Sequence, residues 1–260
     1  MLRAFVIVSI LTVAAPDAAA GIVNVQSILA AEAPEGWSGS ISGSADVRRG
    51  NIDLLLLGAT PLVRYRTGDH LMIGTGRAEL GRTGAGDAEA TFIKKTFAHL
   101  RYRYTIEQWL LGEVFAQHEY DEFRRIELRA LVGAGPKLGL VSTDSLRVGL
   151  GVAYMLEYER LDEQAGLGDS GADDVQHRAS SYLTANYKLD DRVDLVNTFY
   201  AQPRLDAASD TRLLDDAAII VKLTDKVAMT TSFTVSWDNR PPETVEKTDT
   251  TLKSTVTWTF

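Results

Sequence analysis

The side chains that could do covalent chemistry are few in this chain. Its histidines are His70, His99, His118 and His177, and it contains no cysteine. The absence of cysteine excludes a disulfide scaffold, a thiolate zinc site and a cysteine nucleophile, and no Gly-x-Ser-x-Gly nucleophile elbow occurs. His177 and Ser181 are separated by roughly 13 Å along a strand, too far for a hydrogen bond between a nucleophile and its base. We therefore expect no enzyme and no cofactor.

A second group of candidate ligands is the segment from Asp162 to Asp174, which is rich in carboxylates and glycine. Its carboxylates do not follow the spacing of a calcium-binding EF-hand loop, which needs ligands at alternate positions and a terminal glutamate. Weak binding of the divalent cations that bridge lipopolysaccharide is one interpretation, and a solvated surface loop is the simpler one. We expect no metal site here.

Composition and the N-terminus set wider limits. Lys and Arg number 27 against 35 Asp and Glu, for a formal net charge of −8, which excludes a basic nucleic-acid-binding domain. Residues 1–20 read as a signal peptide, because Arg3 precedes an apolar stretch that ends in the small residues Ala18-Ala19-Ala20. The mean hydropathy of −0.07 and the lack of a second long apolar run exclude a helical membrane protein.

Most of the remaining chain alternates with a period of two. Between Val227 and Asp238 every second residue is apolar or aromatic, and the residues between them are small or polar. The same alternation runs from Leu146 to Tyr158 and recurs at 177–189, 193–201, 217–223 and 252–260. Strands of about ten or more residues exceed the usual five or six. Length and alternation together are typical of transmembrane β-strands.

The pattern predicts twelve such strands. We expect them at 37–48, 52–66, 70–82, 89–104, 107–119, 123–141, 145–161, 175–189, 192–204, 211–223, 227–238 and 248–260. Strands this long rarely stay in an open sheet, and closure removes the edges. The predicted fold class is all-β, a closed antiparallel up-and-down transmembrane β-barrel over 37–260. In the fifth strand, two sets of apolar residues that include Phe115 and Val114 compete for the outer face.

Connection lengths indicate which membrane holds the barrel. Every second connection is a tight turn, at 67–69, 105–106, 142–144, 190–191 and 224–226. Those between are mostly longer, at 83–88, 162–174, 205–210 and 239–247, although the ones near 49–51 and 121–122 are short. Bacterial outer-membrane barrels have short periplasmic turns and longer extracellular loops. We therefore expect an outer-membrane protein with both termini on the periplasmic side.

The last strand closes on an aromatic residue. Trp258 and Phe260 share the apolar face of this amphipathic strand. Such an ending resembles the signal by which outer-membrane barrels are recognised for assembly, whereas an exposed edge of this kind would invite aggregation. We expect Trp258 and Phe260 to form an assembly signal, and the partners to be barrel-assembly machinery, outer-membrane lipid and lipopolysaccharide. A monomer is the favoured state.

Short motifs along the chain resemble a known family. They are Val23-Asn24-Val25-Gln26, Gly36-Trp37-Ser38-Gly39, Arg49-Gly50-Asn51, Glu119-Tyr120-Asp121-Glu122-Phe123-Arg124, Gly133 and Gly135, Tyr158-Glu159, and Asp238-Asn239-Arg240-Pro241-Pro242. Their order and spacing resemble the salt-induced outer-membrane protein family (domain-of-unknown-function family 481), apart from Asn51-Ile52-Asp53, where that family has Gly-Asn-Thr. The resemblance implies an outer-membrane barrel and leaves its molecular activity open.

Charged residues occupy the strand face opposite the apolar one. We predict that this face lines the lumen with Arg64, Arg66, Arg101, Arg103, Arg129, Arg147, Glu157, Arg178 and Lys188. The same alternation adds Arg77, Glu79, Lys95, Glu127, Lys137, Asp194 and Lys222. Eight-stranded barrels are filled by side chains and sixteen-stranded ones hold a channel, so twelve strands leave two interpretations open. One is a narrow pore that prefers anions, and the other is a salt-bridged interior that only supports the wall.

Residues 21–36 read as a periplasmic N-terminal extension, and whether they enter the lumen is left open. The function we expect is that of an outer-membrane barrel. The family resemblance implies a role in envelope integrity under osmotic or salt stress, and a low-conductance pore is one of the two interpretations of the lumen. The alternative is a lipid-acting hydrolase embedded in the barrel.

Overall fold

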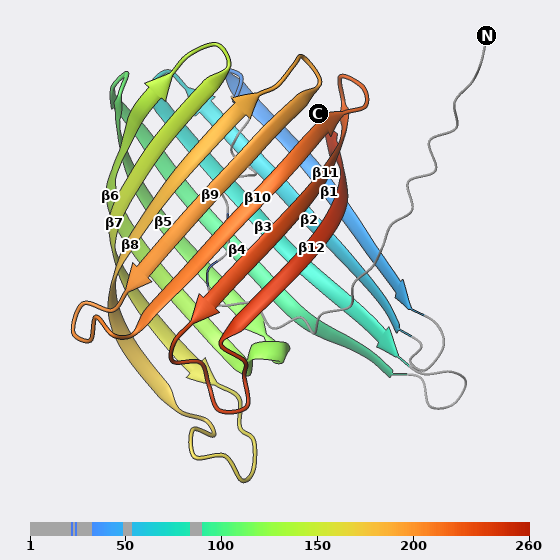
Figure 1. Cartoon of the computed structure of the whole chain (residues 1–260), viewed down its shortest axis with the longest axis vertical. Helices are drawn as coiled ribbons and strands as arrows, with labels where there is room; N and C mark the ends of the chain where they lie inside the picture. The colour runs from blue at the N-terminus through green and yellow to red at the C-terminus, as the bar shows by residue number, and fades with distance from the viewer. Residues whose placement is uncertain (1–21, 23, 25–32, 49–53, 84–89) are drawn as a thin grey trace.

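A computed structural model describes residues 22, 24, 33–48, 54–83 and 90–260. In this part of the chain twelve strands form one sheet that closes where β1 pairs with β12 (Figure 1). Every strand is antiparallel to both neighbours, which confirms the predicted fold class. The strands are β1 (Gly36–Arg48), β2 (Leu54–Thr67), β3 (His70–Thr83), β4 (Ala90–Glu107), β5 (Leu110–Asp121), β6 (Ile126–Ser142), β7 (Leu146–Leu161), β8 (Asp173–Lys188), β9 (Val193–Pro203), β10 (Thr211–Lys222), β11 (Val227–Asp238) and β12 (Thr248–Thr259).

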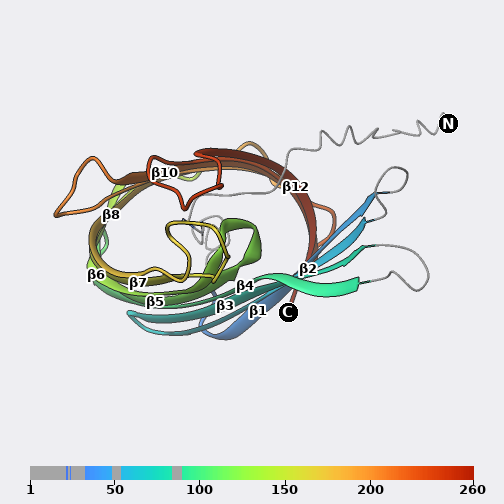
Figure 2. The ribbon, with the colours of Figure 1, turned by 90° about the horizontal axis from the view of Figure 1, so that it is seen from below.

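The two ends of the barrel differ in their connections. The turn end carries the tight connections after β2, β4, β6, β8 and β10, and the loop end carries those after β5, β7, β9 and β11. Strand β1 begins at the turn end, and the chain ends there after β12. Gly39 and Phe260 exchange two backbone hydrogen bonds of 3.1 and 3.0 Å at this end. Seen from the loop end, the barrel is flattened, and the η2 turn (Glu122–Arg124) and the loop 162–172 lie inside its outline (Figure 2).

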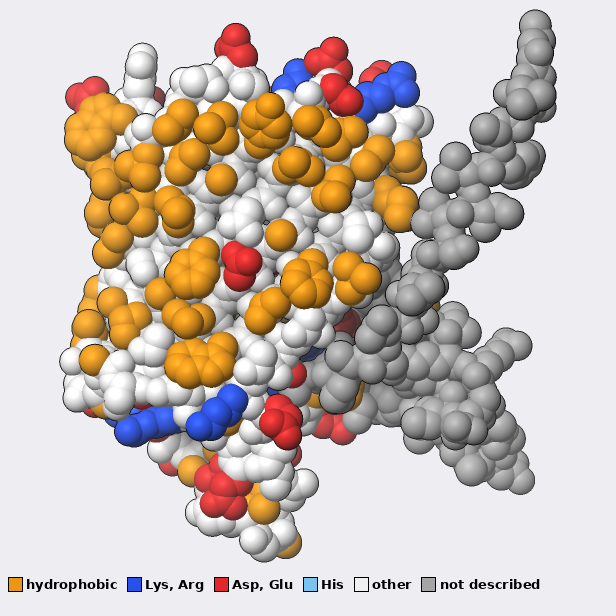
Figure 3. All heavy atoms as spheres, viewed as in Figure 1, with side chains coloured by type: hydrophobic (Ala, Val, Ile, Leu, Met, Phe, Trp, Pro, Cys, Tyr) orange, Lys and Arg blue, Asp and Glu red, His pale blue; other side chains and the backbone are white. Residues whose placement is uncertain are grey.

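The outer wall carries a band of hydrophobic side chains, and charged groups gather at its two ends (Figure 3). Large apolar side chains that are at least 40% exposed occur on most strands, among them Val63, Leu100, Val132, Leu183, Ile219 and Leu252. An apolar outer band is the property that a lipid environment demands of a barrel. No helix in the described ranges is long and apolar enough to cross a membrane.

Three strand boundaries lie three residues from the prediction, namely the end of β4 and the starts of β5 and β6, and the others agree within two residues. The sequence predicted a turn at 105–106, but β4 continues to Glu107 and the turn falls at Gln108 and Trp109. Thr105 and Ile106 are β-branched, and such residues favour strands over turns. At the loop end, η2 delays the start of β6 to Ile126, three residues later than predicted.

The face of β5 that the sequence left undecided is settled. Glu113, Phe115 and Glu119 are buried inside, whereas Val114 is 54% exposed on the outside. Phe115 belongs inside because it packs against Leu131 and Met155 in a small apolar cluster within the lumen.

One predicted inward residue points outward. Glu127 was expected in the lumen, but its side chain is 43% exposed and pairs with Arg160, which is equally accessible. The cause is an irregularity in the pairing of β6 with β7 between Ile126 and Leu128. An extra residue at such a bulge breaks the period of two, so positions on either side of it change face.

Ile22, which precedes the first strand, lies inside the barrel. It is 5% exposed and belongs to a buried cluster with Tyr182, Tyr200 and Leu214, all of them lumen-facing residues. The sequence left open whether residues 21–36 enter the lumen, and Ile22 does so, because its apolar side chain is buried against these residues. Residues 1–21, 23 and 25–32 lie outside the described part, and so does the predicted signal peptide.

Ala33 and Glu35, which directly precede β1, lie at the turn end. There the carbonyl oxygen of Ala33 accepts a hydrogen bond from Arg66 (3.2 Å). The Glu35 carboxylate accepts one from the backbone N–H of Gly68 (2.9 Å), in the turn between β2 and β3.

Candidate functional site: the charged lumen

The structure separates the nine predicted lumen residues into two groups. Six are buried inside the barrel, namely Arg64, Arg101, Arg103, Arg129, Glu157 and Arg178. Arg66, Arg147 and Lys188 are exposed at the turn end of their strands. Arg66 lies 4.0 Å from Glu35, and Lys188 pairs with Asp191 at 2.8 Å, so both take part in contacts at the rim.

A set of paired charges fills the lumen toward the loop end. This loop-end network consists of Lys95, Glu119, Asp121, Arg124, Arg129, Glu157, Glu159, Arg178, Asp210, Arg212 and Asp238. Glu157 lies at its centre and is fully buried. Its Oε1 accepts a hydrogen bond from Arg212 at 2.6 Å. The guanidinium groups of Arg129 and Arg178 each approach the same oxygen to 3.8 Å.

Every arginine of this network contacts more than one partner. Arg212 donates to Asp238 at 3.0 Å and to Glu159 at 3.2 Å, in addition to Glu157. Arg129 donates to Glu159 and, at 3.3 Å, to Glu119. Arg212 on β10 and Glu157 on β7 come from strands that are not neighbours, so these contacts cross the lumen.

The loop-end network is nearly neutral and shielded from solvent. Its five cationic side chains face six carboxylates, a difference of one negative charge. Arg129, Arg178, Glu119 and Glu157 are each 1% exposed or less. A buried ion is tolerated only when it is paired and hydrogen-bonded, and sharing of carboxylates between arginines meets that condition. At this level the lumen is therefore occupied by side chains that are paired with one another and buried.

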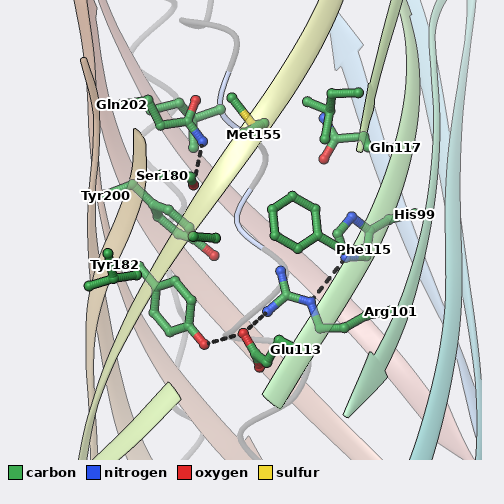
Figure 4. A pocket seen from close by; sticks show the side chains of 14 residues that line it. His99, Arg101, Glu113, Phe115, Gln117, Met155, Ser180, Tyr182, Tyr200 and Gln202 are labelled. Atoms are coloured by element: carbon green, nitrogen blue, oxygen red, sulfur yellow. Dashed lines mark hydrogen bonds and ion pairs between the residues drawn. The ribbon is translucent and has the colours of Figure 1, made fainter. Parts of the chain in front are cut away.

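A different arrangement lies toward the turn end (Figure 4). Glu113 accepts hydrogen bonds from Arg101 (3.1 Å) and Arg103 (2.6 Å), and a third from the hydroxyl of Tyr182 (2.8 Å). The ammonium of Lys137 interacts electrostatically with all three charged groups and with Arg147. We call Arg101, Arg103, Glu113, Lys137 and Arg147 the turn-end cluster. It holds four basic side chains and one carboxylate, so its formal charge is +3.

A small cavity separates the two charged regions. Its volume is about 30 Å³, which is room for one or two water molecules. His99, Arg101 and Glu113 line its polar side, where the Nε of Arg101 donates to the Nε2 of His99 at 3.3 Å (Figure 4). Its apolar side is formed by Phe115, Leu131, Met155 and the Ile22 side chain.

The histidines are scattered. His70 bonds the hydroxyl of Tyr102 at 2.7 Å, and His177 bonds that of Tyr154 at 2.5 Å, in both cases at exposed positions. His99 is buried beside Arg101. Among the described residues, no group of three or more His, Cys, Asp or Glu side chains could hold a metal ion.

Sequence reasoning missed several members of both regions. The missed residues occupy inward positions and include Glu113, Glu119, Glu159, Arg212 and Asp238, the last two near the ends of their strands. The alternation could have found Arg212, because it shares the face of Leu214, Asp216 and Ala218. The face of β5, where Glu113 and Glu119 lie, was ambiguous in the sequence.

Comparison with known proteins assigns a family. The profile of the family described as "Protein of unknown function, DUF481" matches residues 42–260. The chain belongs to this family. The family resemblance found in the motifs is thereby confirmed. No curated protein matches the chain in sequence.

Two solved structures share the fold. The translocator domain of the autotransporter NalP from Neisseria meningitidis is 15% identical, with 90% of this chain and 92% of that one covered and a TM-score of 0.50. An outer-membrane channel from Pseudomonas putida F1 is 13% identical, with 88% and 97% covered and a TM-score of 0.52. This DUF481 chain thus has the fold of outer-membrane β-barrels.

Proposed function

We propose that this DUF481 protein resides in the outer membrane as a narrow, anion-preferring pore that is closed in the described state. Its role would be envelope integrity under osmotic or salt stress. In this placement the turn end faces the periplasm and the loop end faces the cell exterior, since bacterial barrels have short periplasmic turns. The observation that carries the proposal is the surplus of positive charge in the turn-end cluster, against a whole-chain charge of −8.

The surplus charge supports anion preference for an electrostatic reason. Charges inside a cavity with low-dielectric walls act on one another and on passing ions more strongly than charges on an open surface. Glu113 neutralises only one of the four cations around it. Arg147 is exposed at the turn end, so an anion that comes from that side first meets this side chain.

Ion selectivity in planar bilayers tests this function. Purified protein should give small channels whose reversal potential in a salt gradient indicates anion preference. Replacing Lys137 and Arg147 together with Gln should weaken that preference without leaving a buried carboxylate unpaired. Lys226→Gln, which removes the charge of an exposed lysine in the turn after β10, is the matched control. Channels that prefer cations would contradict the proposal.

A second candidate is a barrel that supports the envelope without conducting. The complete burial of the loop-end network favours it, because closed lumens of this kind add rigidity rather than a path. To separate the two functions, Glu119 and Arg124, which pair at 3.1 Å, are replaced together with Gln. Conductance that rises in this double variant supports the pore. Silence in wild type and in this variant supports the structural barrel.

We also propose that Trp258 and Phe260 act in assembly, with the barrel-assembly machinery, outer-membrane lipid and lipopolysaccharide as partners of a monomer. Both rings are exposed, and their centroids lie 5.2 Å apart at the turn end. Phe260→Asp should lower the amount of folded protein in membranes, measured by heat-modifiable migration on gels. Unchanged insertion would count against this role.

A non-enzymatic role is part of the same proposal. Purified protein should not hydrolyse acyl esters. Hydrolysis that is lost with a single His→Ala substitution would instead support the lipid-acting hydrolase.

A further inference from the structure

Residues of β8, β9 and β10 form an apolar socket among the charges of the lumen. Tyr182 on β8, Tyr200 on β9 and Leu214 on β10 are each 6% exposed or less, and they form a cluster with Ile22. The rings of Tyr182 and Tyr200 lie 5.4 Å apart and are tilted by 43°. The hydroxyl of Tyr182 points away to Glu113, so the socket adjoins the turn-end cluster.

Ile22 and Asn24 both lie near β10 inside the barrel. Ile22 shares the buried cluster with Leu214, and the side chain of Asn24 interacts with that of Asp216, the next inward position on the same strand. Asn24 is itself buried, with 8% of its surface exposed. Two alternate residues before β1 thus meet two alternate residues of β10, one pair apolar and one pair polar.

The position of Ile22 matters for the path through the barrel. Ile22 also lines the small cavity between the turn-end cluster and the loop-end network. An aromatic socket in a charged lumen would expose apolar surface if it were empty, and burial of an aliphatic side chain removes that surface from water.

We propose that Ile22 and Asn24 act as an internal plug, and that Tyr182, Tyr200, Leu214 and Asp216 form its receptor inside the barrel. Binding of the plug does not depend on whether the protein conducts. Its effect on ion flow rests on the proposed pore.

Cross-linking tests the binding directly, because the chain has no native cysteine. The pair Ile22→Cys and Leu214→Cys should be joined in folded protein by oxidation or by a short thiol-specific cross-linker. The matched control pairs Ile22→Cys with Asp215→Cys, since Asp215 is adjacent in sequence but exposed on the outer face. A cross-link in the first pair only supports the plug. No cross-link, or equal cross-linking in the control, would overturn it.

Conductance tests the consequence. Ile22→Asp places a charge in the apolar socket and should expel the plug, so channel conductance should rise several-fold over wild type. Ile22→Leu keeps the apolar contact and should behave as wild type. A positive cross-link with silent Ile22→Asp channels would keep the plug and reject the pore. Anion-selective wild-type channels without any cross-link would keep the pore and reject the plug.

Discussion

The two charged regions of the lumen use similar side chains to opposite effect. In the loop-end network five cations face six carboxylates, and the central groups have no contact with solvent. The turn-end cluster contains one carboxylate, Glu113, and four cations, and the Arg147 side chain is exposed to solvent. Balanced, buried charges hold the wall together. In the turn-end cluster the cations outnumber the carboxylate, and the proposed anion preference rests on this difference.

The difference follows from what burial demands. An isolated ion inside a protein loses its hydration, and only partners at hydrogen-bonding distance compensate for that loss. The loop-end network supplies such partners across the lumen, as between Arg212 on β10 and Glu157 on β7. Substitutions should therefore act mainly on stability at the loop end and mainly on selectivity at the turn end.

The largest effect is expected from Glu157→Gln. This change removes the charge that Arg212 contacts at 2.6 Å and that Arg129 and Arg178 approach at 3.8 Å. Breaking a buried ion pair from one side costs about 3–5 kcal/mol. Urea unfolding of the purified barrel in detergent measures the loss. Glu127→Gln is the control, because its pair with Arg160 is exposed on the outer face and should contribute less than about 1 kcal/mol.

A smaller loss of stability, about 1–3 kcal/mol, is expected from Glu113→Gln. The glutamine can still accept a hydrogen bond from Arg101 or Arg103, and Arg147 of the same cluster is exposed to solvent. The same change should increase anion preference in bilayers, because the only carboxylate of the cluster is gone. If Glu113→Gln destabilised the barrel more than Glu157→Gln, the proposed contrast between the two regions would be wrong.

Lys137→Met should change stability least, by about 1 kcal/mol or less in either direction. It removes one surplus cation from beside Arg101 and Arg103, and like charges at such distances repel. The same type of substitution at Arg129, which binds Glu119 and Glu159, should be strongly destabilising. Thermal unfolding of both variants in one detergent decides the point, and equal losses would contradict it.

Much of the wall could be predicted from sequence. A lipid environment requires an apolar outer face on every strand, so the period of two marks the strands one by one. Mid-strand charges such as Arg101, Arg129 and Glu157 stand between apolar neighbours, which places them on the opposite face. The prediction was wrong at Glu127, because a bulge in the pairing of β6 and β7 leaves no mark in the alternation.

The pairing inside the lumen could not be predicted. Strand order gives the neighbours on the wall, but Arg212 meets Glu157 and Tyr182 meets Glu113 across the barrel, between strands that are not neighbours. Those contacts depend on the flattening of the barrel and on side-chain reach. The burial of Ile22 could not be predicted either, because a short apolar segment before the first strand could lie inside or outside the barrel.

The contacts between the loops at the loop end are expected to depend on pH. Above the loop-end network, Arg125 donates hydrogen bonds to Asp169 (2.7 Å) and Asp162 (3.1 Å), and Asp169 also accepts one from the backbone N–H of Glu243 (2.7 Å). These contacts join the loops that follow β7 and β11. Partial burial alone would raise the pKa of Asp169, but the hydrogen bonds from Arg125 and Glu243 outweigh it and hold that pKa below its ordinary value.

Because the pKa of Asp169 is lowered in the folded protein, its stabilising contribution is present above the pKa of an unfolded aspartate, about 3.9, and is lost as the pH falls through the lowered folded value. The loop 162–172 should therefore stay fixed from neutral pH down to about pH 4 and become cleavable by pepsin only in stronger acid. Asp169→Asn should release it at neutral pH, seen as faster amide hydrogen exchange in this loop. The turn 223–226 lies at the opposite end of the barrel from Asp169, so its hydrogen exchange should not change with Asp169→Asn. A loop that exchanges equally fast in wild type and variant would show that the Arg125 contacts do not hold it.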